Sequence, residues 1–234
     1  EAIEAFGVEG LAVKADLSRT ADVTRLVDRV ARRFGRLDVL INSAATFDRT
    51  PLRFLSERQW DYAMHTNLKG PFLCALRASR LMRQGSKIIN FADWAGLRPY
   101  RHYLPYCVSK AGVIGLTKAL AIELAPQIQV NAIAPGPILA PLNMNRLTRA
   151  KVAARVPLKR WGSPEDIVNA VLFLLEGTDY MTGSTLFVDG RLAHRRGKPM
   201  RGAWGTGRGT RNRSFPLPPV TCPLSQTGAL PCIR

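Results

Sequence analysis

The chain has 234 residues and a formal net charge of +17, and 46% of its residues are apolar. This length can bury a sizeable core in one or two domains. No apolar run approaches the roughly 20 residues that a membrane-spanning helix needs, and the acidic start of the chain does not resemble a secretory signal. The sequence therefore predicts a cytoplasmic protein that does not enter the membrane.

The excess positive charge is concentrated near the C-terminus. Residues 191–234 contain nine Lys or Arg and no acidic residue, whereas residues 1–190 carry a net charge of +8. Because this basic segment is rich in Gly and Pro and has no apolar period, we expect a folded domain over residues 1–190 and a disordered tail over residues 191–234. An RNA-binding role for residues 208–213 is the less favoured alternative, so nucleic acid is an unlikely partner.

The cysteines indicate neither a metal site nor a disulfide framework. They include no Cys-x-x-Cys pair and no His at metal-ligand spacing, which leaves free thiols and no metal. They are Cys74, Cys107, Cys222 and Cys232.

Short β-branched runs alternate with amphipathic stretches along residues 11–190, as in a parallel sheet with crossover helices. The first helix follows Asp16 and has Val23, Leu26, Val27 and Val30 on one face. The motif at residues 56–59 is a capping box, and it opens a long helix that passes Asn67 and bends at Pro71. Strands are predicted at residues 11–15, 37–42, 87–91, 128–134 and 184–188.

Two further helices are predicted in the second half of the chain. One contains Tyr106 and runs to about residue 125, and the other begins at Ser163, an N-cap that is followed by proline. Ligands in open parallel sheets bind at the carboxyl ends of the strands. The candidate residues at those ends are Asp16, Asn42, Asp93, Pro135 and Gly136.

Tyr106 and Lys110 are four residues apart and therefore lie on one face of their helix. A phenol has an ordinary pKa of about 10, and a nearby ammonium favours the phenolate. This pair is a candidate for general-acid catalysis, although an ordinary helix with a surface lysine has the same spacing.

Six motifs occur in the order typical of one enzyme family, and each is short on its own. They are Asp16-Leu17, Asn42-Ser43-Ala44-Ala45, Thr66-Asn67, Tyr106-x-x-x-Lys110, Val130-Asn131-x-x-x-Pro135-Gly136 and Arg160-x-Gly162-x-Pro164-Glu165-Asp166. In this respect residues 7–190 resemble the short-chain dehydrogenases/reductases. The resemblance implies an α/β, Rossmann-like, doubly wound parallel sheet that binds NADPH, with NADH as the alternative.

The same resemblance assigns roles to individual residues. Tyr106 would donate a proton, Lys110 would lower the pKa of Tyr106 and hold the nicotinamide ribose, and Asn67 would hold a water in the proton relay. The remaining cofactor-binding residues would be Asp16, Leu17, Asn42, Ala44, Pro135, Gly136 and Ile138. The family's Gly-rich phosphate-binding turn has no counterpart in the sequence, so the fold is expected to lack its first strand, turn, helix and strand.

Asp93 stands where most of the family has a serine that hydrogen-bonds a substrate carbonyl. Pteridine reductases resemble this chain in having aspartate there, and they place a phenylalanine where this chain has Phe47. The resemblance therefore implies reduction of a C=N bond in a dihydropterin or dihydrofolate, with Phe47, Asp93 and Tyr106 binding the substrate. Competing interpretations make Phe47 a packed loop residue and Asp93 a loop cap.

Two alternatives to this function remain open. One is a carbonyl or 3-oxoacyl reductase, and the other is an inactive fragment, because the site for the cofactor phosphates is absent from the sequence. The resemblance also implies a homo-oligomer, usually a homotetramer, built on the helices that carry Asn67 and Tyr106.

Overall fold

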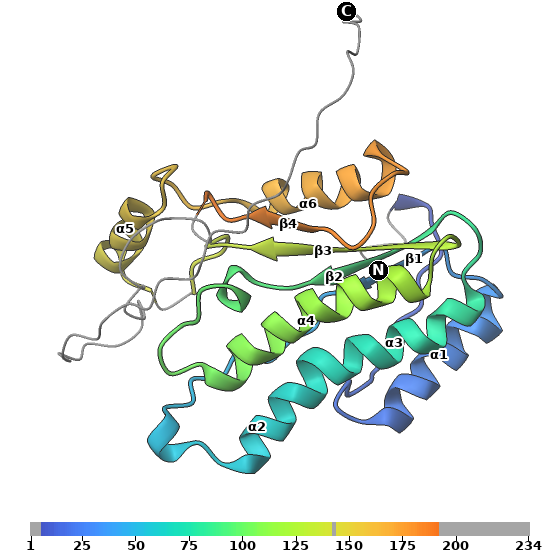
Figure 1. Ribbon diagram of the computed structural model, residues 1–234, viewed down its shortest axis with the longest axis horizontal. Helices are drawn as coiled ribbons and strands as arrows, with labels where there is room; N and C mark the ends of the chain where they lie inside the picture. The colour runs from blue at the N-terminus through green and yellow to red at the C-terminus, as the bar shows by residue number, and fades with distance from the viewer. Residues whose placement is uncertain (1–5, 142–143, 192–234) are drawn as a thin grey trace, which may run out of the picture. The chain divides into compact units, whose positions relative to one another are not determined.

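The computed structural model describes residues 6–141 and 144–191. Its centre is a parallel sheet of four strands in the order β1-β2-β3-β4, which is also their order in the sequence. The strands are β1 (Val39–Asn42), β2 (Ser86–Phe91), β3 (Ile128–Pro135) and β4 (Thr185–Val188). Figure 1 shows all four running side by side through the middle of the domain.

Helices cover both faces of this sheet, as the resemblance implied (Figure 1). The helices α1 (Thr20–Phe34), α3 (Gly70–Ala78) and α4 (Leu104–Glu123) cover one face, with α2 (Glu57–Met64) leading into α3. The helix α6 (Pro164–Leu172) covers the other face, and α5 (Arg146–Arg155) lies beyond the carboxyl end of β3. Among the described residues, no helix has the length and apolar content needed to cross a bilayer.

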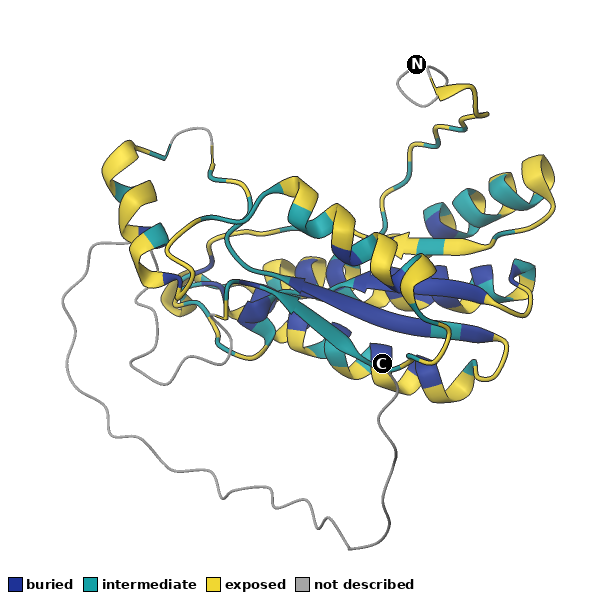
Figure 2. Ribbon diagram, turned by 90° about the horizontal axis from the view of Figure 1, so that it is seen from above, coloured by how far each residue is buried: buried dark blue, intermediate teal, exposed yellow. Residues whose placement is uncertain are grey.

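The core follows the alternation of side chains along the central strands. Ile88 on β2 and Val130 on β3 pack with α3 and α4, whereas Ile89 and Ile133 pack with α6. Because successive side chains of a strand point to opposite faces, β2 and β3 together supply apolar side chains to the core on each face of the sheet. Figure 2 shows β2 and β3 buried along most of their length and β1 much more exposed.

Most of the predicted elements are confirmed, including both caps. The Ser56 hydroxyl accepts from the Gln59 N–H while the Gln59 side chain accepts from the Ser56 N–H. Ser163 and Asp166 form the equivalent pair at the start of α6. These reciprocal bonds satisfy N–H groups that have no partner within the helix, so the local sequence fixes where each helix begins.

Two predictions about secondary structure need correction, and one helix was not predicted. Residues 11–15 alternate in exposure but form no strand, because no described strand pairs with them. The bend expected at Pro71 is a π-helical turn at His65–Lys69, just before it. Proline has no N–H for the ordinary i to i−4 bond, and the preceding turn widens instead. The helix α5 was not predicted, because its apolar residues have no clear period.

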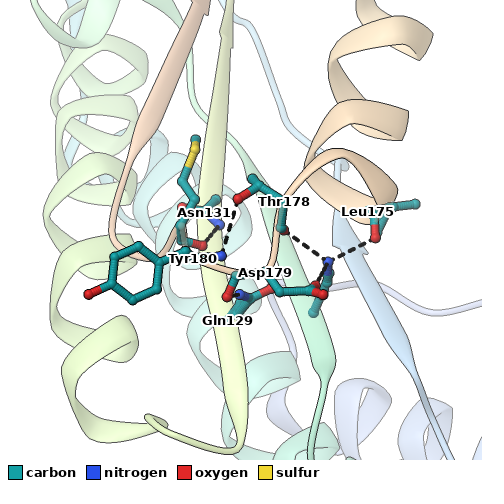
Figure 3. A network of polar contacts seen from close by, with 8 residues as sticks. Gln129, Asn131, Leu175, Thr178, Asp179 and Tyr180 are labelled. Atoms are coloured by element: carbon teal, nitrogen blue, oxygen red, sulfur yellow. Dashed lines mark hydrogen bonds and ion pairs between the residues drawn. The ribbon is translucent and has the colours of Figure 1, made fainter. Parts of the chain in front are cut away.

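A buried lysine joins the sheet to the segment that follows α6. The ammonium of Lys87 donates to the carbonyls of Leu175 at 2.8 Å and Thr178 at 3.3 Å, and it contacts the Asp179 carboxylate at 2.9 Å. The Gln129 side chain also donates to the Asp179 carbonyl. Figure 3 shows these groups converging below the end of the helix. Carbonyls at a helix C-terminus lack intrahelical partners, and a cation there satisfies them.

We expect Lys87→Met to lower the free energy of unfolding by about 2 kcal/mol, the loss typical of hydrogen bonds to a charged group. Asp179→Asn is the matched control and should change stability little, because the Asp179 side chain is 94% exposed whereas that of Lys87 is 10% exposed. Urea unfolding of both variants measures the difference. Equal losses would show that the exposed ion pair, and not the carbonyl contacts, carries the stabilisation.

Candidate active site

The loop after β2 holds Asp93 in a fixed orientation. Asp93 is the N-cap of a short turn at Trp94–Gly96, and its Oδ1 accepts from the Ala95 N–H at 2.7 Å. This cap was the competing interpretation of Asp93. The same carboxyl group also faces the first turn of α4, so the capping bond and a catalytic role are compatible.

Tyr106 meets this carboxyl group directly. Its hydroxyl donates to Asp93 Oδ2 at 2.7 Å, and the tyrosine is buried. Burial raises the pKa of Asp93 against the lowering effect of the Ala95 and Tyr106 donors. Burial also raises the pKa of Tyr106, and the charge of Asp93 raises it further. The Tyr106 phenol therefore keeps its proton and donates it in the hydrogen bond to the Asp93 carboxyl group.

That Lys110 lowers the pKa of Tyr106 stays a prediction, because Asp93 and not Lys110 is the charged group in contact with the Tyr106 hydroxyl. The Lys110 ammonium lies 5.8 Å from the centre of the Tyr106 ring and donates to the Phe91 carbonyl at 2.6 Å. The pKa of Tyr106 is raised, first by burial and then by the charge and the hydrogen bond of Asp93. Residue spacing placed the lysine one turn along the helix, but it did not reveal the competing carboxylate.

Lys110 is itself perturbed by its surroundings. It is almost fully buried, and burial lowers its pKa to about 8, with the Asp93 charge acting in the opposite direction. An ammonium has three N–H donors, and the hydrogen bond to Phe91 uses one of them. The remaining donors suit the hydroxyls of a ribose, as the family resemblance implied.

Asn67 lies in the π-helical turn, and its side chain is fully engaged. Its oxygen accepts from the Thr46 N–H at 2.8 Å, and its amide donates to the Thr46 carbonyl and to Ser109 Oγ, both at 3.0 Å. The water relay stays a prediction, and the side chain instead anchors the loop that follows β1.

That anchored loop carries Phe47 into an aromatic cluster. The Phe47 ring stacks on Tyr103 with centroids 4.5 Å apart and meets the Tyr106 ring edge to face at 4.6 Å. A bond from the Thr50 N–H to the His102 carbonyl, 2.7 Å long, ties the two loops together. Phe47 is packed, as the competing interpretation held, yet 45% of it stays exposed and it lines a pocket.

The pocket in front of Asp93 has a volume of about 410 Å³. It brings together six predicted residues, which are Phe47, Asp93, Tyr106, Pro135, Gly136 and Ile138. Several apolar walls of the pocket were not predicted, because they come from the segment after β3, from α5, from α6 and from the loop between these helices, far along the chain from Asp93. They are Leu139, Pro141, Val152, Trp161 and Ile167.

Other predicted site residues lie outside this pocket. The Asn42 amide donates to the Asn90 side chain at 2.9 Å, and Asn90 in turn donates to Thr117, so this chain of bonds ties β1 and β2 to α4. Ala44 is exposed in the loop after β1. Asp16 accepts from the N–H and hydroxyl of Ser18, and Leu17 packs in a core cluster with Val23, Leu73 and Cys74.

The residues present fit the nicotinamide half of a cofactor. A buried cation with unused donors, a tyrosine and the Pro135-Gly136 turn lie near the ends of adjacent strands, where parallel sheets bind nucleotides. Within residues 6–141 and 144–191, no helix begins after a Gly-rich turn that would hold the pyrophosphate. In the same ranges, no three His, Cys, Asp or Glu side chains gather in a way that could hold a metal.

The fold and the residues of the site are those of an α/β oxidoreductase. The family description "Enoyl-(Acyl carrier protein) reductase" matches residues 1–191. The 3-oxoacyl-[acyl-carrier-protein] reductase FabG of Staphylococcus epidermidis is 39% identical over 197 residues, which cover 81% of this chain and 80% of that protein.

Solved structures agree with this classification. A short-chain dehydrogenase/reductase mutant from Serratia marcescens is 29% identical with a TM-score of 0.75, over 81% of this chain and 79% of its own. A blue fluorescent protein from a metagenomic library, in complex with NADPH, is also 29% identical with a TM-score of 0.75, over 81% and 78% of the two chains. The chain belongs to the short-chain dehydrogenase/reductase family, whose members are NAD(P)-dependent oxidoreductases.

The lowered pKa of Lys110 predicts a pH dependence of stability. Between pH 8 and pH 10.5 the unfolded chain keeps a proton on this lysine that the folded chain has lost. The free energy of unfolding therefore rises with pH in this window. Relative to Lys110→Met, we expect the wild type to gain on the order of 2 kcal/mol from pH 7 to pH 10 in urea unfolding. A pH-independent difference would contradict the lowered pKa.

Proposed function

We propose that this protein reduces a C=N bond of a dihydropterin or dihydrofolate, with NADPH as the hydride donor. The observation that carries the proposal is the 2.7 Å hydrogen bond between Tyr106 and Asp93 at the wall of the aromatic pocket. When bound, the nicotinamide supplies the hydride. The residues of this chain position the substrate and deliver the proton.

The carboxyl group explains the choice of acceptor. A nitrogen beside the hydride-accepting carbon has to be protonated, and Tyr106 can give it a proton while Asp93 binds an adjacent N–H. At a carbonyl, oxygen gains negative charge as hydride arrives. An ionised carboxylate about 4 Å from that oxygen would raise the energy of the negatively charged state by about 4 kcal/mol at an effective dielectric constant near 20. Asp93 thus favours the nitrogen acceptor.

The shape of the pocket supports a flat substrate. Its volume lies within the range of about 300–1,000 Å³ that is typical of small-molecule sites. The Phe47 ring is stacked on Tyr103, and this contact fixes the orientation of the ring at the pocket. A bicyclic heterocycle can gain from contact with such rings, because aromatic groups attract one another in stacked and edge-to-face arrangements.

A second candidate is reduction of a carbonyl or 3-oxoacyl substrate, and the comparisons favour it. The Staphylococcus epidermidis relative at 39% identity is a 3-oxoacyl-[acyl-carrier-protein] reductase. The raised pKa of Asp93 also supports a carbonyl substrate, because a protonated carboxyl group could donate a hydrogen bond to the carbonyl oxygen. For the cofactor, the similar structure that contains NADPH supports our choice of NADPH over NADH.

The variant Asp93→Ser separates the two candidates. We expect it to lower kcat for 7,8-dihydropterin about 100-fold, since one donor or acceptor at a reacting centre is commonly worth that much, and to raise the rate on a 3-oxoacyl thioester. NADPH oxidation measures both reactions. Asp61→Ser, which removes an exposed carboxylate on α2, is the control and should change neither rate.

Wild-type turnover of the 3-oxoacyl thioester without turnover of dihydropterin would select the second candidate. Nicotinamide fluorescence during titration with NADPH should report binding in either case. Failure of the chain to bind NADPH would instead support the inactive alternative.

We also propose that the protein forms a homo-oligomer through its outer helices. Phe72 and Leu76 on α3, and Leu104 and Val108 on α4, are large apolar side chains that remain exposed. Exposed apolar patches of this kind favour association between subunits.

We expect the double variant Phe72→Glu and Leu76→Glu to dissociate the oligomer, because charge placed in an apolar contact is costly to bury. Light scattering coupled to size-exclusion chromatography measures the mass. Leu147→Glu on the exposed face of α5 is the matched control and should keep the mass of the wild type. A monomeric wild type would refute the oligomer.

A further inference from the structure

A second tyrosine reaches the other oxygen of the Asp93 carboxyl group. The Tyr100 hydroxyl lies 3.4 Å from Asp93 Oδ1, while Tyr106 occupies Oδ2 at 2.7 Å. The 3.4 Å contact is long for an O–H donor, and such bonds commonly shorten when substrate closes the site. Tyr100 lines the same pocket as Asp93 and Tyr106.

The position of Tyr100 is fixed from several sides. Its N–H donates to the Cys107 sulfur at 3.2 Å, and the Cys107 thiol in turn points to the Tyr100 carbonyl at 3.9 Å. Its ring meets Trp94 edge to face at 5.1 Å and Phe47 at 6.2 Å. Because Cys107 directly follows Tyr106, the residue that holds Tyr100 is on the same helical turn as the proposed proton donor.

We propose that Tyr100 is a positioning residue, which orients the Asp93 carboxyl group and sets its protonation so that Oδ2 stays on the Tyr106 hydroxyl. This inference rests on the proposed function for its catalytic meaning. Nothing in the spacing of the motifs showed that the Tyr100 hydroxyl would turn toward Asp93.

The groups that face Asp93 determine in which direction its pKa changes when the Tyr100 hydroxyl is removed. Tyr106, Cys107 and Lys110 approach from α4, the Ala95 N–H from the adjoining turn, and Tyr100 from the loop before α4. The Lys110 charge and the three donors favour the ionised carboxylate, and burial opposes it. Loss of the Tyr100 hydroxyl removes one stabilising donor, so the pKa of Asp93 rises.

The variant Tyr100→Phe tests this inference, because it removes the hydroxyl and keeps the ring contacts. In the full 234-residue chain, we expect the apparent pKa of Asp93 to rise by roughly half a unit to one unit. Carboxyl ¹³C NMR measures this titration without substrate, and Asp93→Asn identifies the signal. Tyr103→Phe removes a hydroxyl from the same cluster that does not donate to Asp93, and it should leave the titration unchanged.

With dihydropterin as substrate, kcat of Tyr100→Phe should fall about three- to tenfold, and the limb of the pH profile assigned to Asp93 should move to higher pH. An unchanged Asp93 titration in a variant with wild-type circular dichroism would overturn the role of Tyr100. A shifted titration in a protein that does not reduce dihydropterin would keep that role and remove the proposed substrate. The two failures are therefore distinguishable.

Discussion

The hydrogen bond from Tyr106 to Asp93 joins the sheet to the helix α4, and the candidate active site is built around this contact. Asp93 belongs to the loop after β2, and Tyr106 to the first turn of α4. The sheet fixes one end of this contact and the helix fixes the other. Parallel strands end at a common edge, so a short loop from one strand can meet the start of the helix packed against it.

Burial governs the electrostatics around this contact. It raises the pKa of Asp93 and Tyr106 and lowers that of Lys110, so each group is pushed toward its neutral form. Hydrogen bonds from Ala95 and the tyrosines counter this for the carboxylate. When burial and fixed hydrogen-bond donors have opposite effects on a carboxyl group, small changes in its surroundings can change its protonation state. Such a group is suited to proton transfer.

The aromatic wall of the pocket depends on polar groups that do not line the pocket. Asn67 holds the main chain of Thr46, and this places the next residue, Phe47, against Tyr103 and Tyr106. The π-helical turn that contains Asn67 is therefore part of the architecture of the site. Functional positions are often found at such irregular turns, because they redirect a side chain that a regular helix would point elsewhere.

The sequence by itself determined the parallel α/β class, the helix caps at Ser56 and Ser163, and the position of Asp93 and Pro135-Gly136 just beyond or at the carboxyl ends of β2 and β3. These follow from local hydrogen bonding and from periodicity, which act over a few residues. Only the tertiary structure decided that the Asp93 carboxyl group contacts the Tyr106 hydroxyl, that residues 11–15 form no strand, and that distant apolar side chains line the pocket. Each of these depends on distances between groups that are far apart in the chain, and local sequence patterns do not determine such distances.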